Sequence, residues 1–507
     1  MPGNFSFGKI ALSADARPSP APEVIGDAAP FRIAILGDFR GSRGDDATLP
    51  PVGSAIRVDR NSLDTVMARL GVDLRLAVNG ENSPPVVLKF RSVDDFHPDR
   101  ILDTKLFQPL REARRRLADP ATFRAAAAEL GILPAAKSPP SPPPATAPPA
   151  PDSSAGTTDL LAQILKQSQE QPTVPSREDR AWRAYLDRIT AGHTWSEDPR
   201  QDEMVAHVEA SMTGLLREIL HQPAFQALEA IWRGLYRLTR ELETGASLTI
   251  DLIDTTRDAL VADLISTTPL DSTATYKRLV DDTVAAEGER PWALLVGVFT
   301  LEPTPLDVAL LWRLGQIARL AQAPFVAAAS PRFVGCDALA VTPDPDRWSA
   351  PPTVDGWSDL RRSDEAPFLG LALPRVILRS PYGPDTDPID AFAFEERGTP
   401  HAHEEYLWGN PALEVALLIG RAFAASGWAW TEGYDPEISD LSSPIEQLDG
   451  QPVAKPCAEA ILGQRAIDRL LDAGLMPMVS LRHRDAVRLA QLRSIAEPPA
   501  ALAVRCD

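Results

Sequence analysis

The stretch from residue 291 to residue 331 constrains the fold most, because it has the pattern of a strand, a helix and a second strand with short loops between them. Ala293 to Phe299 is a short run rich in Leu and Val, typical of a strand buried on both faces. Thr304 and Pro305 supply an N-cap and a first-turn proline, and apolar residues follow at helical spacing. A second apolar run occupies Pro324 to Ser330. The stretch therefore predicts a right-handed βαβ unit with parallel strands and further helices over both faces of its sheet.

Proline marks the main division of the chain. Half of residues 134–151 are proline, and nearly all the others are Ala, Ser or Thr. Such a stretch cannot form a helix or a central strand, so it predicts a semi-rigid polyproline spacer of about 3.1 Å per residue. A ligand for a signalling domain is the alternative, since the PxxP pattern is present, but basic flanking residues are sparse. We expect two folded parts joined by this spacer.

The expected fold class is α/β, with a small α+β domain in residues 1–133 and a larger α/β domain in residues 201–507 built round the βαβ unit. A Pro-rich linker, residues 134–155, and a partly disordered helical segment, residues 156–200, lie between them. The small domain is expected to contain strands over 31–36 and 85–90, a helix over 63–70 that Asp59 or Asn61 caps and Gly71 ends, a turn over 92–99 that Asp94 or Asp95 caps, and a helix over 106–117. The large domain is expected to contain helices over 202–221 and 224–241 and a half-buried strand over 247–253.

Charge and hydropathy exclude several classes of partner. The net charge of −19 argues against nucleic acid and anionic membrane, which both need a basic footprint. No stretch reaches about 18 uninterrupted apolar residues, and the N-terminal residues lack the pattern of an export signal. Three widely spaced cysteines, Cys336, Cys457 and Cys506, are expected to be unpaired thiols in a reducing cytoplasm.

Motifs for catalysis or cofactor binding are weak throughout the chain. Gly37, Gly41 and Gly44 follow a strand, but the sequence has neither the dinucleotide fingerprint nor the lysine-serine ending of a phosphate loop. His401 and His403 lie beside two glutamates in HAHEEY, where a metal site is the alternative to a solvated loop; their spacing is not the helical i,i+4 pair. We expect no catalytic residue, no cofactor and no metal.

Three features leave alternatives open. Arg375 and Arg379 lie in an apolar strand, so each is either at an edge that reaches solvent or in a buried pair with a carboxylate; the flanking prolines favour the edge. The amphipathic segment 159–168 is either a frayed helix that docks on its own protein or a peptide for a partner's groove. The tryptophans are expected to anchor cores and interfaces.

Several strings resemble the two subunits of the type VI secretion contractile sheath. The large subunit is resembled by ILHQPAFQALEAIWRGLYRL from Ile219, ARLAQAPFVAAASP from Ala318, LRRSDEAPFLGLALPRVILRSPYG from Leu360, FAFEE from Phe392 and YLWGNPALEVALLIGRAFAASGW from Tyr406. The small subunit is resembled by PFRIAILGDFRG from Pro30, VDRNSLDTVMARLGVDLRL from Val58 and LKFRSVDDFHPDRI from Leu88. The chain thus resembles both subunits joined by the spacer, which would raise the effective concentration of each half for the other.

This resemblance implies a mechanical function. Sheaths of the family are cytoplasmic helical tubes that assemble around an inner tube, contract to drive it outward and are dismantled by a ring-shaped ATPase. Strands exchanged between protomers hold them together, and contraction releases free energy stored in packing. Two departures stand out. Val298 and Phe299 replace the usual Asp-Tyr after Gly297, and the chain stops at Asp507 where family large subunits continue with a tail.

The expected function is a structural sheath subunit that self-associates and contracts; the alternative is a sheath-derived cap, baseplate or assembly-regulating protein, with a metal- or nucleotide-dependent enzyme as a third reading. Expected partners are copies of itself or other sheath subunits, the inner-tube protein, the baseplate and a disassembling ATPase, without nucleic acid or membrane insertion. The candidate structural or interface residues are Asp38, Phe39, Asp95, Phe96, Phe225, Trp232, Arg233, Pro324, Phe325, Pro374, Arg375, Tyr382 and Trp408. The candidate unfoldase-docking residues are Leu160, Leu161, Ile164 and Leu165.

Overall fold

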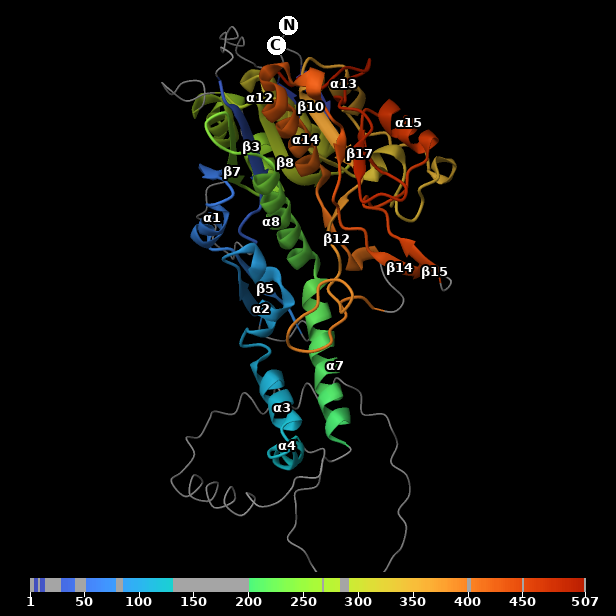
Figure 1. Ribbon diagram of the computed structural model, residues 1–507. Coiled ribbons are helices and arrows are strands. Elements are labelled where there is room, and N and C mark those ends of the chain that lie inside the picture. Colours follow the sequence, from blue (N-terminus) through green and yellow to red (C-terminus); the bar gives the residue numbers. More distant parts are fainter. Residues whose placement is uncertain are drawn as a thin grey trace, which may run out of the picture.

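The structure is a computed structural model, and Figure 1 shows its course. It describes residues 4–7, 10–13, 29–41, 52–78, 85–130, 200–266, 269–282, 291–398, 403–448 and 451–505. The Pro-rich linker, the segment 159–168 and His401 therefore lie outside the described residues.

A nine-stranded sheet forms the centre of the molecule (Figure 1). Its middle strands run parallel in the spatial order β16, β10, β9, β8, β3, β7, and antiparallel β17 and β4 flank them, with β13 beyond β17. The bounds in spatial order are β13 Glu437–Ile438, β17 Val487–Leu489, β16 Met476–Ser480, β10 Leu369–Leu373, β9 Phe325–Ala329, β8 Leu294–Leu301, β3 Phe31–Gly37, β7 Leu248–Asp254 and β4 Ala55–Val58. The prediction of an α/β protein is confirmed.

Strand β3 lies inside this sheet although it precedes the proline-rich stretch. All seven of its residues are buried, as its nearly uninterrupted apolar sequence FRIAILG requires. Phe31 pairs with Leu248 of β7 on one side, and Ile33 pairs with Leu294 of β8 on the other. The parts of the chain before and after the linker therefore share one sheet, which the sequence pattern did not predict.

Alternate side chains of β3 enter two different hydrophobic cores. Phe31, Ile33 and Ile35 pack with helices α8 (Pro223–Glu241) and α14 (Pro411–Ser426). Ala34 and Leu36 face the opposite way and pack with α9 (Arg257–Ser266) and α12 (Pro305–Ala321). The sheet is therefore covered on both faces. By length and composition one described helix, Pro411–Thr431, could cross a membrane, and most of it is buried within the protein like a core helix.

The predicted βαβ unit is confirmed as β8, α12 and β9. Strands β8 and β9 are parallel neighbours. Thr304 is the N-cap of α12, its side chain accepts a hydrogen bond from the Asp307 amide, and Pro305 is the first helical residue. An added Cβ at Gly297 would lie 2.5 Å from the Phe325 ring, so this glycine lets the ring of β9 cross β8.

The small region before the linker also contains the expected elements. Gly71 ends helix α1 (Leu63–Leu70) in the left-handed conformation at φ 69°. The predicted cap of α1 is wrong: Ser62 is the N-cap, and Asp59 instead accepts the amides of Asn61 and Ser62 in the preceding turn. Strands β5 (Asp73–Leu76) and β6 (Val86–Lys89) form an antiparallel pair.

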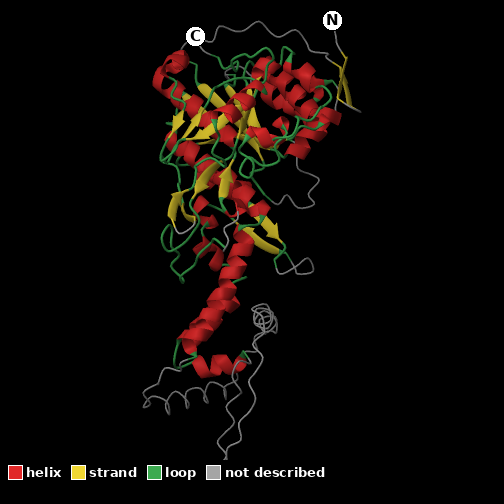
Figure 2. Cartoon of the chain, turned by 90° about the vertical axis from the view of Figure 1, so that its right-hand side faces the viewer, coloured by secondary structure: helices red, strands yellow, loops and turns green. Residues whose placement is uncertain are grey.

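A helical stem extends from the sheet and brings the two flanks of the linker together (Figures 1 and 2). Helix α7 (Gln201–Leu220) forms one side of the stem, and α3 (Gln108–Ala118) packs against it. The Gln201 side chain donates to the Leu117 carbonyl at 2.9 Å, and Arg114 contacts Glu209 at 2.7 Å. The stem therefore joins the small region to the large one a second time, far from β3.

The remaining elements surround these cores. Two-stranded sheets comprise β1 (Asn4–Phe7) with β2 (Ile10–Ser13), β11 (Val376–Arg379) with β12 (Leu407–Gly409), and β14 (Ile445–Leu448) with β15 (Gln451–Ala454). The other α-helices are α2 (Pro98–Leu102), α4 (Phe123–Glu129), α10 (Ala274–Tyr276), α13 (Trp357–Arg361) and α15 (Gln464–Asp472).

One strand prediction is wrong in its burial. Strand β7 was expected to be half buried because its sequence alternates, yet all seven residues are buried. It lies between β3 and β4, and its polar residues are paired: Arg57 donates to both carboxylate oxygens of Asp251. Partnered acids inside the sheet therefore resemble a solvent-facing row in the sequence.

Candidate functional site: a buried aromatic and ionic junction

Aromatic side chains from both sides of the linker meet at the N-terminal end of α8. Phe90 and Phe96 stack with their ring centroids 4.2 Å apart. Phe225 of α8 approaches both rings edge-on, at 5.9 Å from Phe90 and 5.6 Å from Phe96. All three rings are buried, so two of the predicted interface residues, Phe96 and Phe225, form a contact within the chain.

Phe39 and Trp232 make a second contact between the two regions. The ring of fully buried Phe39 lies edge-on to fully buried Trp232 at 6.1 Å, and the indole N–H donates to the Phe39 carbonyl at 3.1 Å. The Phe39 amide donates to Asp254 at the end of β7. These residues occupy the carboxyl ends of β3 and β7, which is the edge where open α/β sheets bind ligands.

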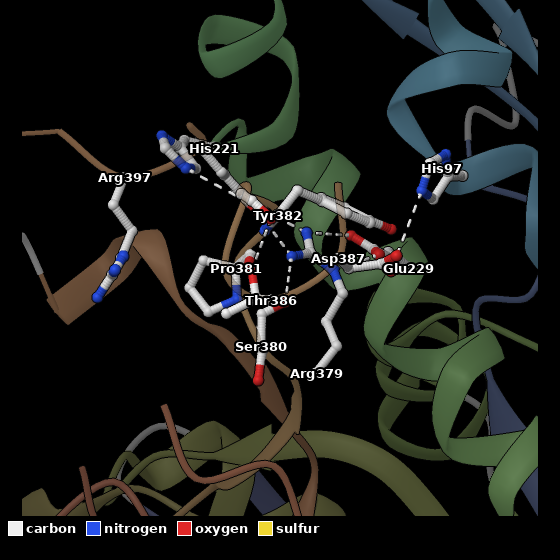
Figure 3. Close-up of polar contacts among 12 residues, drawn as sticks. His97, His221, Glu229, Arg379, Ser380, Pro381, Tyr382, Thr386, Asp387 and Arg397 are labelled. Carbon is white, nitrogen blue, oxygen red and sulfur yellow. Dashed lines mark hydrogen bonds and ion pairs between the residues drawn. The ribbon is translucent and has the colours of Figure 1, made fainter. Parts of the chain in front are cut away.

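A buried ion network continues from this aromatic contact (Figure 3). The Arg379 guanidinium lies between two carboxylates: its Nε is 2.8 Å from Glu229 Oε1, and its Nη1 is 2.7 Å from Glu396 Oε2. Glu229 also pairs with Arg233 at 2.7 Å, and Arg233 donates to the Tyr382 hydroxyl at 2.8 Å. The edge interpretation of Arg379 is therefore wrong, and the buried-pair alternative is correct, because 8% of Arg379 is exposed.

Electrostatics keep this network ionised. Burial by itself would raise the pKa of Glu396, but the charge of Arg379 and the hydrogen bonds from His221, Arg379 and the Tyr382 amide lower it to about 2. Burial opposes the charged form of Arg379, yet the charges of Glu229 and Glu396 raise its pKa well above the ordinary value. Burial also raises the pKa of Tyr382, whose ring lies 4.2 Å from the Arg379 guanidinium carbon. The network is a fixed structural charge cluster at neutral pH.

Tyr382 connects the network to the small region. The His97 ring meets the Tyr382 ring edge-on at 4.9 Å (Figure 3). Next to it, the Asp390 amide donates to Asp99 at 3.2 Å. Arg217 of α7 donates to the carbonyls of Glu395 and Arg397. The loop from residue 380 to 398 therefore ties the small region, α7 and β11 together.

A second, smaller cluster surrounds Glu459. Arg375 donates to Glu459 at 2.5 Å, and the His403 ring contacts the same carboxylate at 3.1 Å. Burial raises the pKa of Glu459, but these hydrogen bonds lower it to about 2. His403 also stacks on the Trp408 ring at 4.8 Å and accepts the indole N–H through its carbonyl. His403 thus belongs to a structural cluster.

The other candidate residues have local roles. Asp95 accepts the amides of Arg91 and Ser92 and forms a capping box on a 3₁₀ turn, Val93–Phe96. Asp38 accepts the Gly41 amide at 3.4 Å. Phe325 is buried in β9, while Pro324 and Pro374 stand directly before β9 and after β10.

Sequence reasoning missed three members of the junction: Phe90, Glu396 and Arg217. A charged residue within an apolar run was the available signal, and it marked Arg379 and Glu229. The partner Glu396 lies in a loop whose path no periodicity predicts. Within the part of the chain that the structure describes, no group of three or more His, Cys, Asp or Glu residues could hold a metal ion.

Comparison with known proteins places this scaffold among contractile-sheath proteins. The family model VipB, described as EvpB/VC_A0108, tail sheath N-terminal domain, matches residues 202–496. A second model, described as type VI secretion system, VipA, VC_A0107 or Hcp2, matches residues 27–124. Because the first match covers more than half of the chain, the protein belongs to the VipB tail-sheath family. The same chain also carries the VipA-like region.

A curated relative agrees with this assignment. The type VI secretion system sheath protein TssC1 of Pseudomonas aeruginosa is 30% identical over 306 residues. The match covers 59% of this chain and 61% of the relative. The chain thus spans somewhat under two thirds of the length of that protein.

Proposed function

We propose that this protein is a structural subunit of a type VI secretion contractile sheath, in which a VipA-like and a VipB-like region act as one unit. The chain's function on this proposal is to associate with copies of itself or with other sheath subunits. Contraction is then a rearrangement of contacts between such units, with no chemical step inside the subunit.

The position of β3 is the observation that carries this proposal. A strand of the VipA-like region hydrogen-bonds to VipB-like strands on both edges, and its side chains fill both cores. The Phe96–Phe225 contact and the Arg379 network add buried contacts between the regions. Such a unit is stiff enough to transmit force between its neighbours without coming apart.

The filled carboxyl edge of the sheet supports a mechanical function over a catalytic one. In open α/β enzymes this edge holds a crevice for the ligand. Here Phe39 and Trp232, both fully buried, pack at that edge. The candidate interface residues, the cytoplasmic location and the partners named for the family (inner tube, baseplate and disassembling ATPase) belong to the same proposal.

Electron microscopy of the purified full-length chain tests this proposal. Striated tubes or stacked rings, formed by the chain alone or with the products of neighbouring genes, are the expected result. Binding to sheath or baseplate components without polymerisation would favour the accessory alternative. Particles of monomer size in every mixture, without binding, would contradict both. Stoichiometric metal or nucleotide in the purified protein would indicate an enzyme instead.

A further inference from the structure

Exposed apolar side chains gather at two places on the large region. Val341 is the most exposed large hydrophobic residue of the described chain, at 70%. Ile445, Val453 and Ile461 are 61%, 44% and 47% exposed. We call residues 335–347, which carry Val341, the acidic loop. We call the hollow between the β14–β15 hairpin and the turn after β16 the basic groove.

The basic groove is a large, firmly built hollow of about 740 Å³. Val453 and Ile461 supply apolar lining, and Lys455, Arg482 and Arg484 supply positive charge. The Ser480 hydroxyl accepts the Ala458 amide at 2.7 Å, and the Leu481 amide donates to Ala486 at 2.9 Å, so the floor and the turn are held in place. The β14–β15 hairpin beside the groove projects from the body of the molecule (Figure 1).

Positive charge at this groove is unusual in a chain of net charge −19. Arg482 is exposed and makes no ion pair with any of the residues that the structure describes. Arg484 pairs with Glu437, and the Lys455 ammonium lies 4.2 Å from the Tyr406 ring centre. Asp485 is the acidic residue in the lining, so the rim as a whole is basic. A segment that combines apolar and acidic side chains fits such a groove.

The acidic loop has this chemistry and a fixed shape. Val341 stands between Asp337, whose side chain is 95% exposed, and Asp344, which is also exposed. The Trp348 indole N–H donates to the Thr342 carbonyl at 2.8 Å. Gly335 has φ +77°, and an added Cβ there would lie 2.2 Å from the Ser349 carbonyl oxygen. The loop is therefore ordered before any partner binds, which lowers the entropic cost of docking.

We propose that the acidic loop of one copy of this chain docks in the basic groove of a second copy. Val341 enters between Val453 and Ile461, and Asp337 approaches Arg482. Because the two surfaces differ, the contact is heterologous and repeats into a ring or an open filament. The inference deepens the proposed sheath function by naming one contact through which subunits join.

Analytical ultracentrifugation of the full-length chain with exposed-site variants tests this docking. Val341→Lys removes the apolar tip, and Arg482→Glu reverses the rim charge. Each change is expected to weaken self-association at least about tenfold, the effect of losing one buried valine side chain. An equimolar mixture of the two variants should form a dimer and nothing larger, since each retains one intact surface. Raising the salt concentration should weaken the wild-type association.

Matched controls make the test decisive. Arg124→Glu and Val87→Lys make the same chemical changes at exposed positions outside both surfaces, so they should associate like the wild type. A wild type that stays monomeric, a mixture without dimer, or variants that associate normally would each overturn the docking. Tubes formed equally well by wild type and both variants would overturn it while leaving the sheath proposal standing. A wild type that neither self-associates nor binds sheath proteins would end both.

Discussion

Arg379 joins three segments of the chain through one side chain. Its guanidinium contacts Glu229 of α8 and Glu396 of the loop, and it lies over the Tyr382 ring, which touches His97 of the small region. A buried charge is tolerated only when its partners are complete, because removing one partner leaves the other charge without compensation in a medium of low dielectric constant.

Replacing Glu229 with glutamine tests that dependence. The change keeps the shape of the side chain but leaves Arg379 with one carboxylate, so it should lower the free energy of unfolding by about 3 to 5 kcal/mol. Urea denaturation followed by tryptophan fluorescence measures the loss. Glu112→Gln is the control, since it breaks an exposed pair with Arg115 and should leave the transition unchanged. Equal midpoints for both variants would contradict a structural role for the network.

Acid should dismantle the same network in a defined pH window. The pKa of Glu396 is about 2 in the folded chain against an ordinary 4.5, so its stabilisation is complete above about pH 5 and is lost as the pH falls toward 2. This shift corresponds to about 3 kcal/mol at neutral pH. Glu396→Gln should therefore be less stable than the wild type at pH 7, and the difference should shrink through this window. A difference that is constant with pH would refute the assignment.

At the scale of elements, the sequence predicted what periodicity and local caps determine. The βαβ unit from β8 to β9, helices α1, α7 and α8, and the stop at Gly71 all follow from the spacing of apolar residues and from turn chemistry. The place of β3 between β7 and β8 could not be predicted, because strand order depends on contacts between residues that are distant along the chain. The same limit applies to the junction: Arg379 was visible as an anomaly, but its partner Glu396 was not.

Gly297 offers a test of how tightly adjacent strands pack. An added Cβ would lie 2.5 Å from the buried Phe325 ring and 3.1 Å from the Phe299 ring, so Gly297→Ala must displace core side chains. We expect a loss of about 1 to 3 kcal/mol in unfolding free energy. Gly214→Ala on α7 is the matched control: nothing lies within 4 Å of its added Cβ, and helix propensity should raise stability by up to about 1 kcal/mol. The prediction fails if the two alanines have the same effect.

The molecule as a whole is held together by its interior contacts, independently of the linker. The buried strand β3, the aromatic contacts and the stem each join the regions before and after residues 131–199. The covalent connection therefore adds effective concentration to an association that has its own stability.

Cutting the chain within the linker tests this independence. A specific protease site inserted among residues 134–151 should be cleavable without loss of the fold. The two fragments should migrate separately under denaturing conditions and elute together from a size-exclusion column in native buffer. The uncut protein with the same insertion is the control. Fragments that separate in native buffer would show that the regions depend on the tether.

The two flanks of the linker meet on the stem, where Gln201 bonds to the Leu117 carbonyl. A gene that encodes both regions in one reading frame consequently delivers them in a one-to-one ratio from each round of translation. Neither half then waits in the cell with the apolar edges of its strands uncovered, and the ribosome itself sets the stoichiometry that two separate genes would have to balance by regulation.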